Sequence, residues 1–521
     1  MAQDHGHDPS KRPDRPGRAG DTGGPAVDSA WGWMSSWMGA WSETLGAPLS
    51  SLGAAPMPQR PERPGSLGLS DDFAASMAQR RADELLRHAQ RLSPFYRRHL
   101  AGLTRSGTPW SDLPTVDKRL MMANFDDWHT DPSITLERVR AFATDPQQQG
   151  RELDGRYAVW SSSGTSGEPA LYLHDIAALD VYARLLESRM DKRCAVDRWW
   201  LQASVGALGP FGLRPRSALI AALDGPYASI AFWRRQCRQH PWLSDSARAM
   251  SVTWPAERLR EELTAWRPAF IASYPSLLIE LARWQRAGLL ALAPLALWSG
   301  GERLALNTRQ WIEASFGAPV VNDYGASECL SIAFECRHGR LHLNDDWVIL
   351  EPIDRQGEPV PPGEASHSVL LTNLANRIQP LIRYNLGDSV TFFADRCPCG
   401  NRRPAFTVEG RHDDTLRVED GQGGVVHLAP MALTTAVEDG ADVHRFQLRQ
   451  TDARRIELRL DLTHSADPGQ VRQAAAAALR RYLAGQGVQG VAVEVSPDVP
   501  LPEPRSGKLR QVVCLLPAEA L

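Results

Sequence analysis

Apolar residues between positions 140 and 409 come in short runs that alternate with stretches of helical periodicity. Three of these runs, at residues 266–275, 291–302 and 319–325, each end in small or polar residues. A short apolar run bounded in this way predicts a buried strand, and alternation of such strands with helices predicts a parallel sheet. We therefore expect an α/β body whose ligands bind beyond the carboxyl ends of these strands.

The pattern changes after residues 410–414. The later part of the chain contains three strand-like runs and one helical segment, at residues 446–449, 455–462, 491–495 and 467–484. Such a set predicts a separate small α+β domain. We place a large α/β domain at 71–409 and a small mobile domain at 410–521, with Asp413 at the hinge between them. A partly disordered extension, residues 1–70, precedes both.

The extension contains one element with a clear period. Residues 1–28 are rich in Gly, Pro and charged side chains, which predicts disorder. A short amphipathic helix is predicted at about 29–46, because tryptophans recur at every fourth position, at Trp33, Trp37 and Trp41. Its polar face carries almost no positive charge, so docking onto the protein itself or a partner is favoured over contact with lipid.

Length and charge narrow the function classes. A chain of 521 residues exceeds what one hydrophobic core ordinarily supports, so two or more domains are expected. A net charge of −3 gives no general attraction to nucleic acid or anionic lipid. The seven cysteines follow no disulfide framework, which fits a reducing compartment. No secretory signal is visible, and the longest apolar stretch, 289–298, is too short to span a bilayer, so a cytoplasmic location is predicted.

The most distinctive loop is Ser161–Pro169, which has the sequence Ser-Ser-Ser-Gly-Thr-Ser-Gly-Glu-Pro. Its small residues would let backbone N–H groups approach a polyphosphate, although a surface turn has the same composition. Strand-like residues at 157–160 and 171–173 flank the loop, so we expect a hairpin-like connection rather than a loop that leads into a helix. It is not a Walker A loop, because no Gly-Lys-Ser/Thr ends it.

Six short segments occur in an order and spacing that a known superfamily shares. They are Ser161–Pro169, Ser299–Glu302, Tyr324–Glu328, Arg383–Asp388, Gly410–Asp414 and Ser506–Lys508. Together they resemble the phosphate loop, Gly-Gly-Glu, Tyr-Gly-x-x-Glu, Arg-Tyr-Arg-Thr-Gly-Asp, hinge and C-terminal lysine motifs of the adenylate-forming superfamily of acyl-CoA synthetases and adenylation domains. The resemblance is specifically to the phenylacetate-CoA ligase-like branch, and it covers about residue 75 to the end.

The resemblance implies an adenylate-forming enzyme fold and a set of nucleotide-binding residues. The phosphate loop would hold the leaving pyrophosphate through Ser161, Ser162, Ser163, Gly164, Thr165, Ser166 and Gly167. The remaining nucleotide contacts would come from Gly300, Gly301, Glu302, Asp323, Tyr324, Gly325, Ser327 and Asp388. Within this set, Asp388 would accept the two ribose hydroxyls, as acidic residues do in other nucleotide sites.

The same resemblance implies three catalytic residues. Glu328 would hold Mg²⁺, a hard cation that prefers carboxylate oxygen and water. Lys508 would reach between the substrate carboxylate and the α-phosphate of ATP when the small domain closes. Arg411 would pair with phosphate. Taken alone, Asp388 or Arg411 could instead form a surface ion pair, and Lys508 could be a flexible terminal lysine.

The implied function is activation of a carboxylic acid by ATP and Mg²⁺, followed by thioester formation with CoA or the phosphopantetheine of an acyl carrier protein. Tyr274, Pro275, Ser299 and Ala326 are expected to line the acid pocket, together with part of Trp199–Phe211, and would suit an aromatic or medium-sized acid. Transfer of AMP to an acceptor that is not a thiol is a variant within this class. The alternative is a non-catalytic scaffold on the same fold, directed to a membrane, granule or partner by the Trp-rich helix.

Three positions depart from the superfamily pattern. Glu168 stands where relatives often carry Lys, and its charge would repel polyphosphate unless the side chain turns away. Asn385 replaces the second Arg of the Asp388 motif. Residues 416–420 lack the basic, Gly-rich continuation that precedes the pantetheine tunnel, which places the thioester step in more doubt than adenylation.

A cysteine motif is not accounted for by these assignments. Cys397 and Cys399 form a Cys-Pro-Cys-Gly knuckle, and Cys336 and His342 lie upstream, with His338 as a substitute ligand. Four such ligands are enough to close a tetrahedral, structural zinc site. The Cys-x-Cys spacing is unusual for zinc, so a metal-free cysteine turn stays open as an alternative.

Overall fold

The computed structural model describes residues 71–103, 110–162, 170–189, 216–223, 225–239, 244–411, 414–422, 424–428, 430–463, 465, 467–504 and 507–516. Several predictions lie outside these residues. They concern the extension 1–70 with its Trp-rich helix, loop residues 163–169 with Glu168, the segment Trp199–Phe211, hinge residue Asp413, and Ser506.

Helices form the N-terminal part of the described chain. They are α2 (Asp71–Leu92), α3 (Pro94–His99), η2 (Trp110–Asp112), α4 (Lys118–Ala123), α5 (Phe125–Trp128), α6 (Leu136–Thr144) and η3 (Pro146–Gln148). In α2, Ala82, Leu85 and Ala89 are fully buried, and their spacing of three and four residues places them on one face of the helix. Ser93 and Asp117 cap α3 and α4 through side-chain hydrogen bonds to backbone N–H groups.

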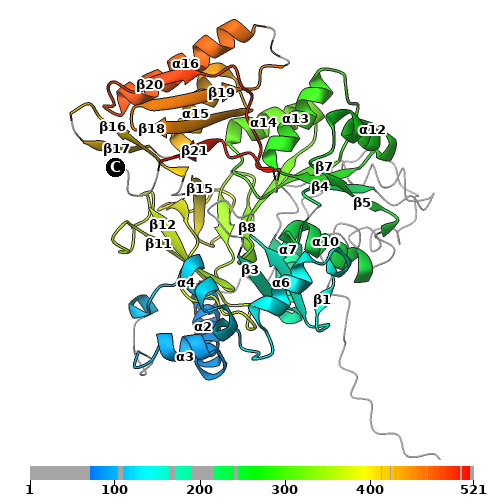
Figure 1. Ribbon diagram of the computed structural model, residues 1–521, viewed down its shortest axis with the longest axis vertical. Coiled ribbons are helices and arrows are strands. Elements are labelled where there is room, and N and C mark those ends of the chain that lie inside the picture. The colour runs from blue at the N-terminus through cyan, green and yellow to red at the C-terminus, as the bar shows by residue number, and fades with distance from the viewer. Residues whose placement is uncertain are drawn as a thin grey trace, which may run out of the picture.

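A nine-stranded sheet has the strand order β14-β15-β10-β9-β8-β7-β6-β4-β5. Figure 1 labels its strands β15, β8, β7, β4 and β5. Its parallel part consists of β5 (Ala247–Ser251), β4 (Ser217–Ala221), β6 (Phe270–Ser273), β7 (Ala296–Ser299) and β8 (Val320–Ala326). Helices α10 (Ala228–Gln239), α12 (Ala256–Trp266), α13 (Pro275–Arg286) and α14 (Leu306–Phe316) connect or follow these strands. The three strands predicted at 266–275, 291–302 and 319–325 are thus β6, β7 and β8, which are adjacent and parallel.

The antiparallel part of this sheet consists of β9 (Cys329–Glu335), β10 (Leu341–Leu343), β14 (Asp388–Phe392) and β15 (Ala405–Arg411). Two three-stranded sheets pack nearby. The first contains β1 (Glu152–Leu153), β2 (Tyr157–Ser161) and β3 (Leu171–Asp175), and helix α7 (Ile176–Arg189) follows it; the second contains β11 (Val348–Ile353), β12 (Ser368–Asn373) and β13 (Tyr384–Asn385). The pairing of β2 with β3 is antiparallel, as predicted for a hairpin that carries the phosphate loop.

The C-terminal part has its own hydrophobic core, formed by buried residues between Leu416 and Val512. Its elements are β16 (Leu416–Glu419), β17 (Val425–Leu428), α15 (Pro430–Ala441), β18 (Phe446–Asp452), β19 (Arg455–Leu460), α16 (Pro468–Gly485), β20 (Ala492–Val495) and β21 (Val512–Cys514). Figure 1 shows these elements gathered beside α13 and α14 of the large domain. No helix within the described ranges is long and apolar enough to cross a membrane.

Candidate active site

The carboxyl ends of β6, β7 and β8 bring three predicted segments into one line. Ser273 of β6 is in register with Ser299 of β7, and Ser299 is in register with Asn322 of β8. Tyr274 and Pro275 follow β6 and begin α13. Because parallel strands end at the same edge of a sheet, residues after these three strands form one surface, as the sequence predicted.

Ser299 lies at the centre of this edge. Its side chain is fully buried, and its hydroxyl has no hydrogen-bond partner among the described residues. A buried hydroxyl ordinarily has a partner, because burying it without one costs about 1–3 kcal/mol. A polar atom of a bound substrate is one such partner, so this observation is consistent with the predicted acid pocket.

Asp323 faces the backbone that follows β7. Its Oδ1 accepts a 2.8 Å hydrogen bond from the indole nitrogen of Trp298, and a Cβ atom added at Gly300 would lie 3.2 Å from the same oxygen. Burial raises the pKa of Asp323 to about 6, and the indole hydrogen bond opposes this rise. Gly300 therefore leaves room for a carboxylate that can accept a hydrogen bond from a ligand at this edge.

Glu302 binds protein groups on both sides of the site. Its carboxylate accepts hydrogen bonds from the backbone N–H of Ser276 at 2.9 Å, from the hydroxyl of Ser276 at 3.0 Å and from the backbone N–H of Leu509 at 2.7 Å. Burial raises its pKa, while these hydrogen bonds act in the opposite direction. Glu302 thus joins the first turn of α13 to the C-terminal loop, and its contact with nucleotide stays a prediction.

Lys508 reaches this edge from the C-terminal part of the chain. The Nζ atom of Lys508 lies 5.5 Å from the ring centre of Tyr274. A Cβ atom added at Gly301 would lie 3.2 Å from the same Nζ atom. Burial lowers the pKa of Lys508, and the carboxylates of Glu302 and Glu503 oppose that shift. The structure therefore brings the predicted catalytic lysine together with the Gly-Gly-Glu segment and the predicted acid pocket.

Glu328 follows β8 and is buried beneath two tyrosines. The hydroxyl of Tyr172 donates a 2.5 Å hydrogen bond to Glu328 Oε1, and the hydroxyl of Tyr384 lies 3.2 Å from the same oxygen. Burial raises the pKa of Glu328, and the hydrogen bond from Tyr172 opposes the rise. The carboxylate is therefore held in one orientation by phenol groups from β3 and β13.

Asp388 and Arg411 lie opposite each other at the paired ends of β14 and β15. One guanidinium nitrogen of Arg411 lies 3.1 Å from Asp388 Oδ1, and the hydroxyl of Tyr324 donates a 2.6 Å hydrogen bond to Oδ2. The structure thus brings Asp388 together with Tyr324, which lies 64 positions before it in the chain, and with Arg411, which lies 23 positions after it. Asn385 takes no part in this group: its Oδ1 accepts hydrogen bonds from Ser368 and from the backbone N–H of Gly387, so it shapes the turn before Asp388.

The described ends of the phosphate loop lie beside the Glu328 segment. Ser162 pairs with Ala170 through its backbone and its hydroxyl, which closes the base of the loop. The hydroxyl of Ser327 contacts the carbonyl oxygen of Ser161 at 3.5 Å. The loop thus begins next to Ser327, which precedes Glu328 in the chain.

Gly325 is required by the turn between β8 and β9. A Cβ atom added there would lie 2.2 Å from the carbonyl oxygen of Leu330, which no side chain tolerates without backbone movement. Ala326, also predicted for the pocket, ends β8 and pairs with Cys329. Glycine at this position therefore lets the chain reverse tightly between Tyr324 and Glu328.

Two residues near the site were missed by the sequence reasoning. Tyr172 belongs to strand β3, whose first four residues are all buried, so no alternation of buried and exposed positions pointed to it. Lys118, at the start of α4, lies close enough to Glu328 and Arg411 for both charges to affect its pKa, which burial lowers. A lysine after Asp117 in a helix-capping sequence gives no signal of this proximity.

Among the described residues, the predicted zinc ligands gather in one place away from these groups. Ligand atoms of Cys336, His342, Cys397 and Cys399 all lie within 4.8 Å of one another. They occupy the turn between β9 and β10, β10 itself and the loop between β14 and β15. The substitute ligand His338 belongs to the same turn, and its backbone N–H donates to Cys336 Sγ.

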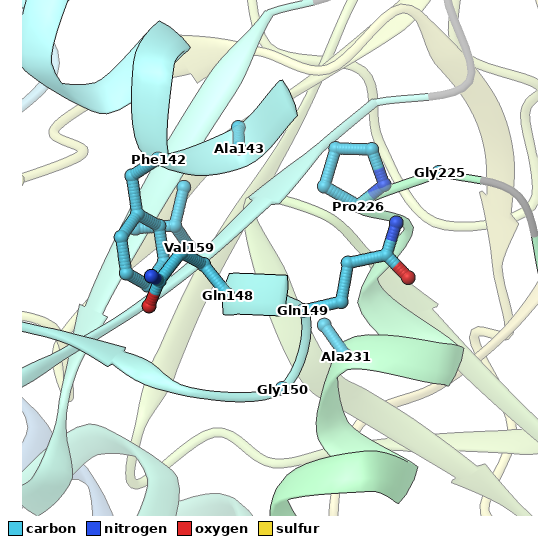
Figure 2. Close-up of a pocket in the computed structure, with 9 residues that line it drawn as sticks. All are labelled: Phe142, Ala143, Gln148, Gln149, Gly150, Val159, Gly225, Pro226 and Ala231. Atoms are coloured by element: carbon cyan, nitrogen blue, oxygen red, sulfur yellow. The ribbon is translucent and has the colours of Figure 1, made fainter. Parts of the chain in front are cut away.

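A small cavity lies on another side of β2 and is not the candidate site. Figure 2 shows its lining residues, which are Phe142, Ala143, Gln148, Gln149, Gly150, Val159, Gly225, Pro226 and Ala231. Its volume is about 10 Å³, enough for about one water molecule. Its lining includes no titratable side chain and none of the predicted site residues.

Comparison with known proteins identifies the fold. No protein-family model matches the chain. Protein CapK of Staphylococcus aureus is 24% identical over 216 residues, which cover 40% of this chain and 46% of CapK, so the match spans about half the length of that relative. The crystal structure of 2-hydroxyisobutyryl-CoA ligase in the postadenylation state with 2-HIB-AMP matches with a TM-score of 0.58 and 20% identity, covering 85% of this chain and 89% of that chain. The same ligase in the thioesterification state, with 2-HIB-AMP and CoA, gives a TM-score of 0.51 at 20% identity, covering 86% and 90%.

The chain therefore has the fold of the adenylate-forming enzymes over about 85% of its length, which confirms the predicted fold class. This fold consists of the α/β body and the smaller C-terminal α+β part described above. The assignment to the phenylacetate-CoA ligase-like branch stays a prediction.

Proposed function

We propose that the protein activates a carboxylic acid with ATP and Mg²⁺ to form an acyl or aryl adenylate, and then transfers the acyl group to the thiol of CoA or of a carrier-protein phosphopantetheine. In the first step a carboxylate oxygen of the acid bonds to the α-phosphorus, and the bond to the leaving pyrophosphate breaks. In the second step the thiolate sulfur bonds to the carbonyl carbon, and AMP leaves with the electrons of the broken C–O bond. The solved ligase named above was crystallised with an acyl adenylate and CoA, which motivates both steps.

The position of Lys508 is the observation that carries this proposal. It comes from the C-terminal part of the chain, yet its ammonium group lies beside Gly301 and Tyr274 of the large domain. A half-buried positive charge there would stabilise the negative charge that develops as carboxylate and α-phosphate react, and positioning of this kind supplies much of the catalysis in phosphoryl chemistry. We propose Lys508 as the group that spans substrate carboxylate and phosphate.

The small domain is held in this position by polar contacts to α13 and α14. Arg283 of α13 lies 3.0 Å from the carboxylate of Asp461, and Asn307 of α14 donates a 3.0 Å hydrogen bond to Asp439. The hydroxyl of Thr434 accepts a 2.7 Å hydrogen bond from Arg303. We propose that residues 410–521 act as a lid, with the hinge at Asp413, and that these contacts favour the arrangement used for adenylation.

The donor set near the phosphate loop fits Mg²⁺. Glu328 offers a buried carboxylate, which is the ligand type that Mg²⁺ prefers, and the residue before it, Ser327, contacts Ser161 at the base of the loop. When bound, Mg²⁺ would neutralise charge on the phosphates. Tyr172 and Tyr384 would keep the carboxylate oriented, and Arg411 and Lys118 would add positive charge on the same side.

We assign roles to Asp388, Asp323 and Ser299 from their positions in the candidate site. Asp388, held between Tyr324 and Arg411, would exchange these partners for the ribose hydroxyls. Asp323 beside Gly300 would accept a hydrogen bond from the adenine amino group. Ser299, whose buried hydroxyl has no partner among the described residues, would contact the acid.

ATP–pyrophosphate exchange tests the proposal. The full-length protein is incubated with ATP, Mg²⁺, labelled pyrophosphate and a panel of aromatic, hydroxylated and medium-chain acids. We expect exchange with at least one acid and its loss by at least about a hundredfold in Lys508→Ala, because removing a charge that acts in the transition state costs several kcal/mol. No exchange with any acid, together with no ATP binding by calorimetry, would refute the proposal.

A matched control separates catalysis from lid stability. Arg472 is an exposed basic residue on α16 of the same small domain, and Arg472→Ala is expected to keep the wild-type exchange rate. Product analysis by mass spectrometry after addition of CoA or a carrier protein then identifies the acceptor. Exchange without any thioester would restrict the function to adenylation.

A further inference from the structure

The cluster formed by Cys336, His342, Cys397 and Cys399 has no role in the proposed reaction. Three of these side chains are buried and the fourth, Cys399, is half-buried. The cysteines are free thiols in the structure. Soft sulfur and imidazole ligands buried together in this way are typical of zinc sites and unusual as a packing choice, because four polarisable donors gather where an apolar core would otherwise form.

Distances within the cluster match those of a tetrahedral site. Sγ of Cys336 lies 3.5 Å from Sγ of Cys397, and Sγ of Cys399 lies 3.3 Å from Nε2 of His342. A zinc ion with Zn–S bonds of about 2.3 Å and a Zn–N bond of about 2.0 Å separates two sulfurs by about 3.8 Å and sulfur from nitrogen by about 3.5 Å. These two pairs would have to separate by about 0.2–0.3 Å to accommodate the ion, and all four ligand atoms lie within 4.8 Å of one another.

The hydrogen bonds around the cluster favour metal-binding forms of its members. Nδ1 of His342 lies 3.2 Å from the carbonyl oxygen of Arg403, so Nδ1 carries the proton and Nε2 presents its lone pair to the cluster. Backbone N–H groups donate to two of the sulfurs: that of His338 to Cys336 at 3.4 Å, and that of Asn401 to Cys399 at 3.3 Å. Such hydrogen bonds stabilise thiolates, which are the form that binds metal.

The backbone geometry of the turn at Cys397–Gly400 is compatible with metal binding by both of its cysteines. Gly400 has a φ angle of +83°, and its N–H donates to the carbonyl oxygen of Cys397 at 3.1 Å. A residue with a side chain would be strained in this conformation. The turn therefore directs Cys397 and Cys399 toward the same point despite the single residue between them, which is how a Cys-x-Cys pair can serve as two ligands.

We propose that these four side chains bind one structural Zn²⁺ ion. Four protein ligands complete a tetrahedral shell and leave no position for substrate or water, which is the arrangement of structural zinc sites. The ion would join the turn between β9 and β10 to the loop between β14 and β15. That loop is at the end of the β14–β15 hairpin opposite to Asp388 and Arg411, so the ion would stabilise the strands that position these residues and would not take part in the reaction.

Metal analysis of the full-length protein, purified without a histidine tag, tests the proposal. We expect about one zinc per chain by mass spectrometry of the metal content, and loss of most of that zinc in Cys399→Ser and in His342→Gln. The control is Cys237→Ser, which replaces a half-buried cysteine of α10 outside the cluster and is expected to keep the zinc. Zinc retained at the wild-type level in Cys399→Ser and His342→Gln would place the ion elsewhere and overturn the assignment.

Cobalt substitution covers the case in which the variants fail to fold. Wild-type protein produced with Co²⁺ in place of zinc is expected to show the visible absorption of tetrahedral cobalt and a thiolate-to-cobalt charge-transfer band. Addition of Zn²⁺ should abolish both. The proposal would be overturned if wild-type protein bound no zinc when produced with zinc and no cobalt when produced with cobalt. Recovery of the cluster cysteines as a disulfide would also overturn it.

Discussion

The hydroxyl of Tyr172 donates a 2.5 Å hydrogen bond to Oε1 of Glu328, across 156 positions of sequence. Tyr384 lies 2.9 Å from the Tyr172 hydroxyl and 3.2 Å from the same carboxylate oxygen. The predicted magnesium ligand is therefore fixed by two phenols from two different sheets. A buried carboxylate held in this way is preorganised, because little rearrangement is needed when a cation arrives.

The first prediction concerns this hydrogen bond. Tyr172→Phe removes one of the two phenols while keeping the ring that packs against Trp128. Hydrogen bonds to charged groups contribute about 1.5–3 kcal/mol, so we expect ATP–pyrophosphate exchange to fall by about tenfold or more and to need a higher Mg²⁺ concentration. The measurement is the exchange rate as a function of Mg²⁺ concentration.

A hydroxyl elsewhere provides the control. Tyr157 lies on the neighbouring strand β2, and its hydroxyl donates a 2.8 Å hydrogen bond to Asp131. Tyr157→Phe removes this hydroxyl. We expect wild-type Mg²⁺ dependence for this variant. An unchanged Mg²⁺ dependence in Tyr172→Phe as well would show that Tyr172 does not position Glu328 for catalysis.

The second prediction concerns the contact between the two domains. Asp461 receives Arg283 from α13 at 3.0 Å and Arg445 from the small domain at 3.2 Å, and the carboxylate is largely buried. Asp461→Asn removes the charge that draws the two arginines together, and we expect exchange to fall by about tenfold, which corresponds to about 1.4 kcal/mol. Asp452→Asn, at an exposed end of β18, should leave exchange unchanged. Equal rates in both variants would refute a role of this contact in the adenylation arrangement.

The third prediction uses the tight turn at Gly325. An alanine Cβ there would lie 2.2 Å from the carbonyl oxygen of Leu330, so Gly325→Ala must move backbone between β8 and β9. We expect a loss of about 2–4 kcal/mol in the free energy of unfolding, together with loss of exchange. Gly485→Ala, at a position with no atom within 4 Å of the added carbon, serves as the control and should change stability by less than about 1 kcal/mol. Chemical denaturation measures both, and similar stabilities would contradict the steric argument.

The fourth prediction is a pH dependence. His174 stacks on Trp160 at 4.3 Å and lies between the Tyr182 hydroxyl and the carbonyl oxygen of Ser327, each at 3.1 Å. Burial lowers its pKa to about 3. Between this value and about 6.5 the unfolded chain binds more protons than the folded one, so the stability from neutral His174 is present above pH 6.5 and falls as the pH decreases.

The variant His174→Phe separates the contribution of His174 to the pH dependence of stability from the contributions of the other titratable groups. At pH 7.5 it should be less stable than wild type by about 1–3 kcal/mol, because two buried polar groups lose a partner. The difference should shrink when the unfolding midpoints are compared at pH 5, since only the wild type loses the histidine contribution. His129, whose pKa burial lowers to about 4, contributes equally to both proteins. If the stability difference between wild type and His174→Phe is the same at pH 7.5 and pH 5, His174 does not contribute this pH dependence.

Local patterns in the sequence were enough to predict much of the fold. The apolar runs at 266–275, 291–302 and 319–325 are strands β6, β7 and β8, since a continuous apolar run with a polar end is what a strand buried on both faces requires. The hairpin around Ser161–Pro169 and the helix at 467–484 followed from equally local signals. The expected positions of Lys508 and Asp388 depended instead on the order of motifs.

Other features of the site depend on contacts that no local pattern encodes. Nothing in the residues around Tyr172 points to Glu328, and nothing around Asn385 shows that its side chain turns toward Gly387 rather than toward phosphate. The motif around Glu302 gives no sign that its carboxylate accepts hydrogen bonds from the backbone N–H groups of Ser276 and Leu509. Such partners come from strands and loops that are far apart in the chain and meet only when the sheets pack.

The sequence by itself determined the types of the candidate site residues and the order in which they occur, because residue type, alternation and turn propensity are local properties. Tertiary structure alone decided that Lys508 approaches Gly301 and that Asp388 lies between Tyr324 and Arg411. It also decided that ligand atoms of Cys336, of His342 in β10, and of Cys397 and Cys399 in a second loop lie within 4.8 Å of one another. Those relations depend on how a nine-stranded sheet and the C-terminal domain pack, and packing joins groups through distance in space rather than distance along the chain.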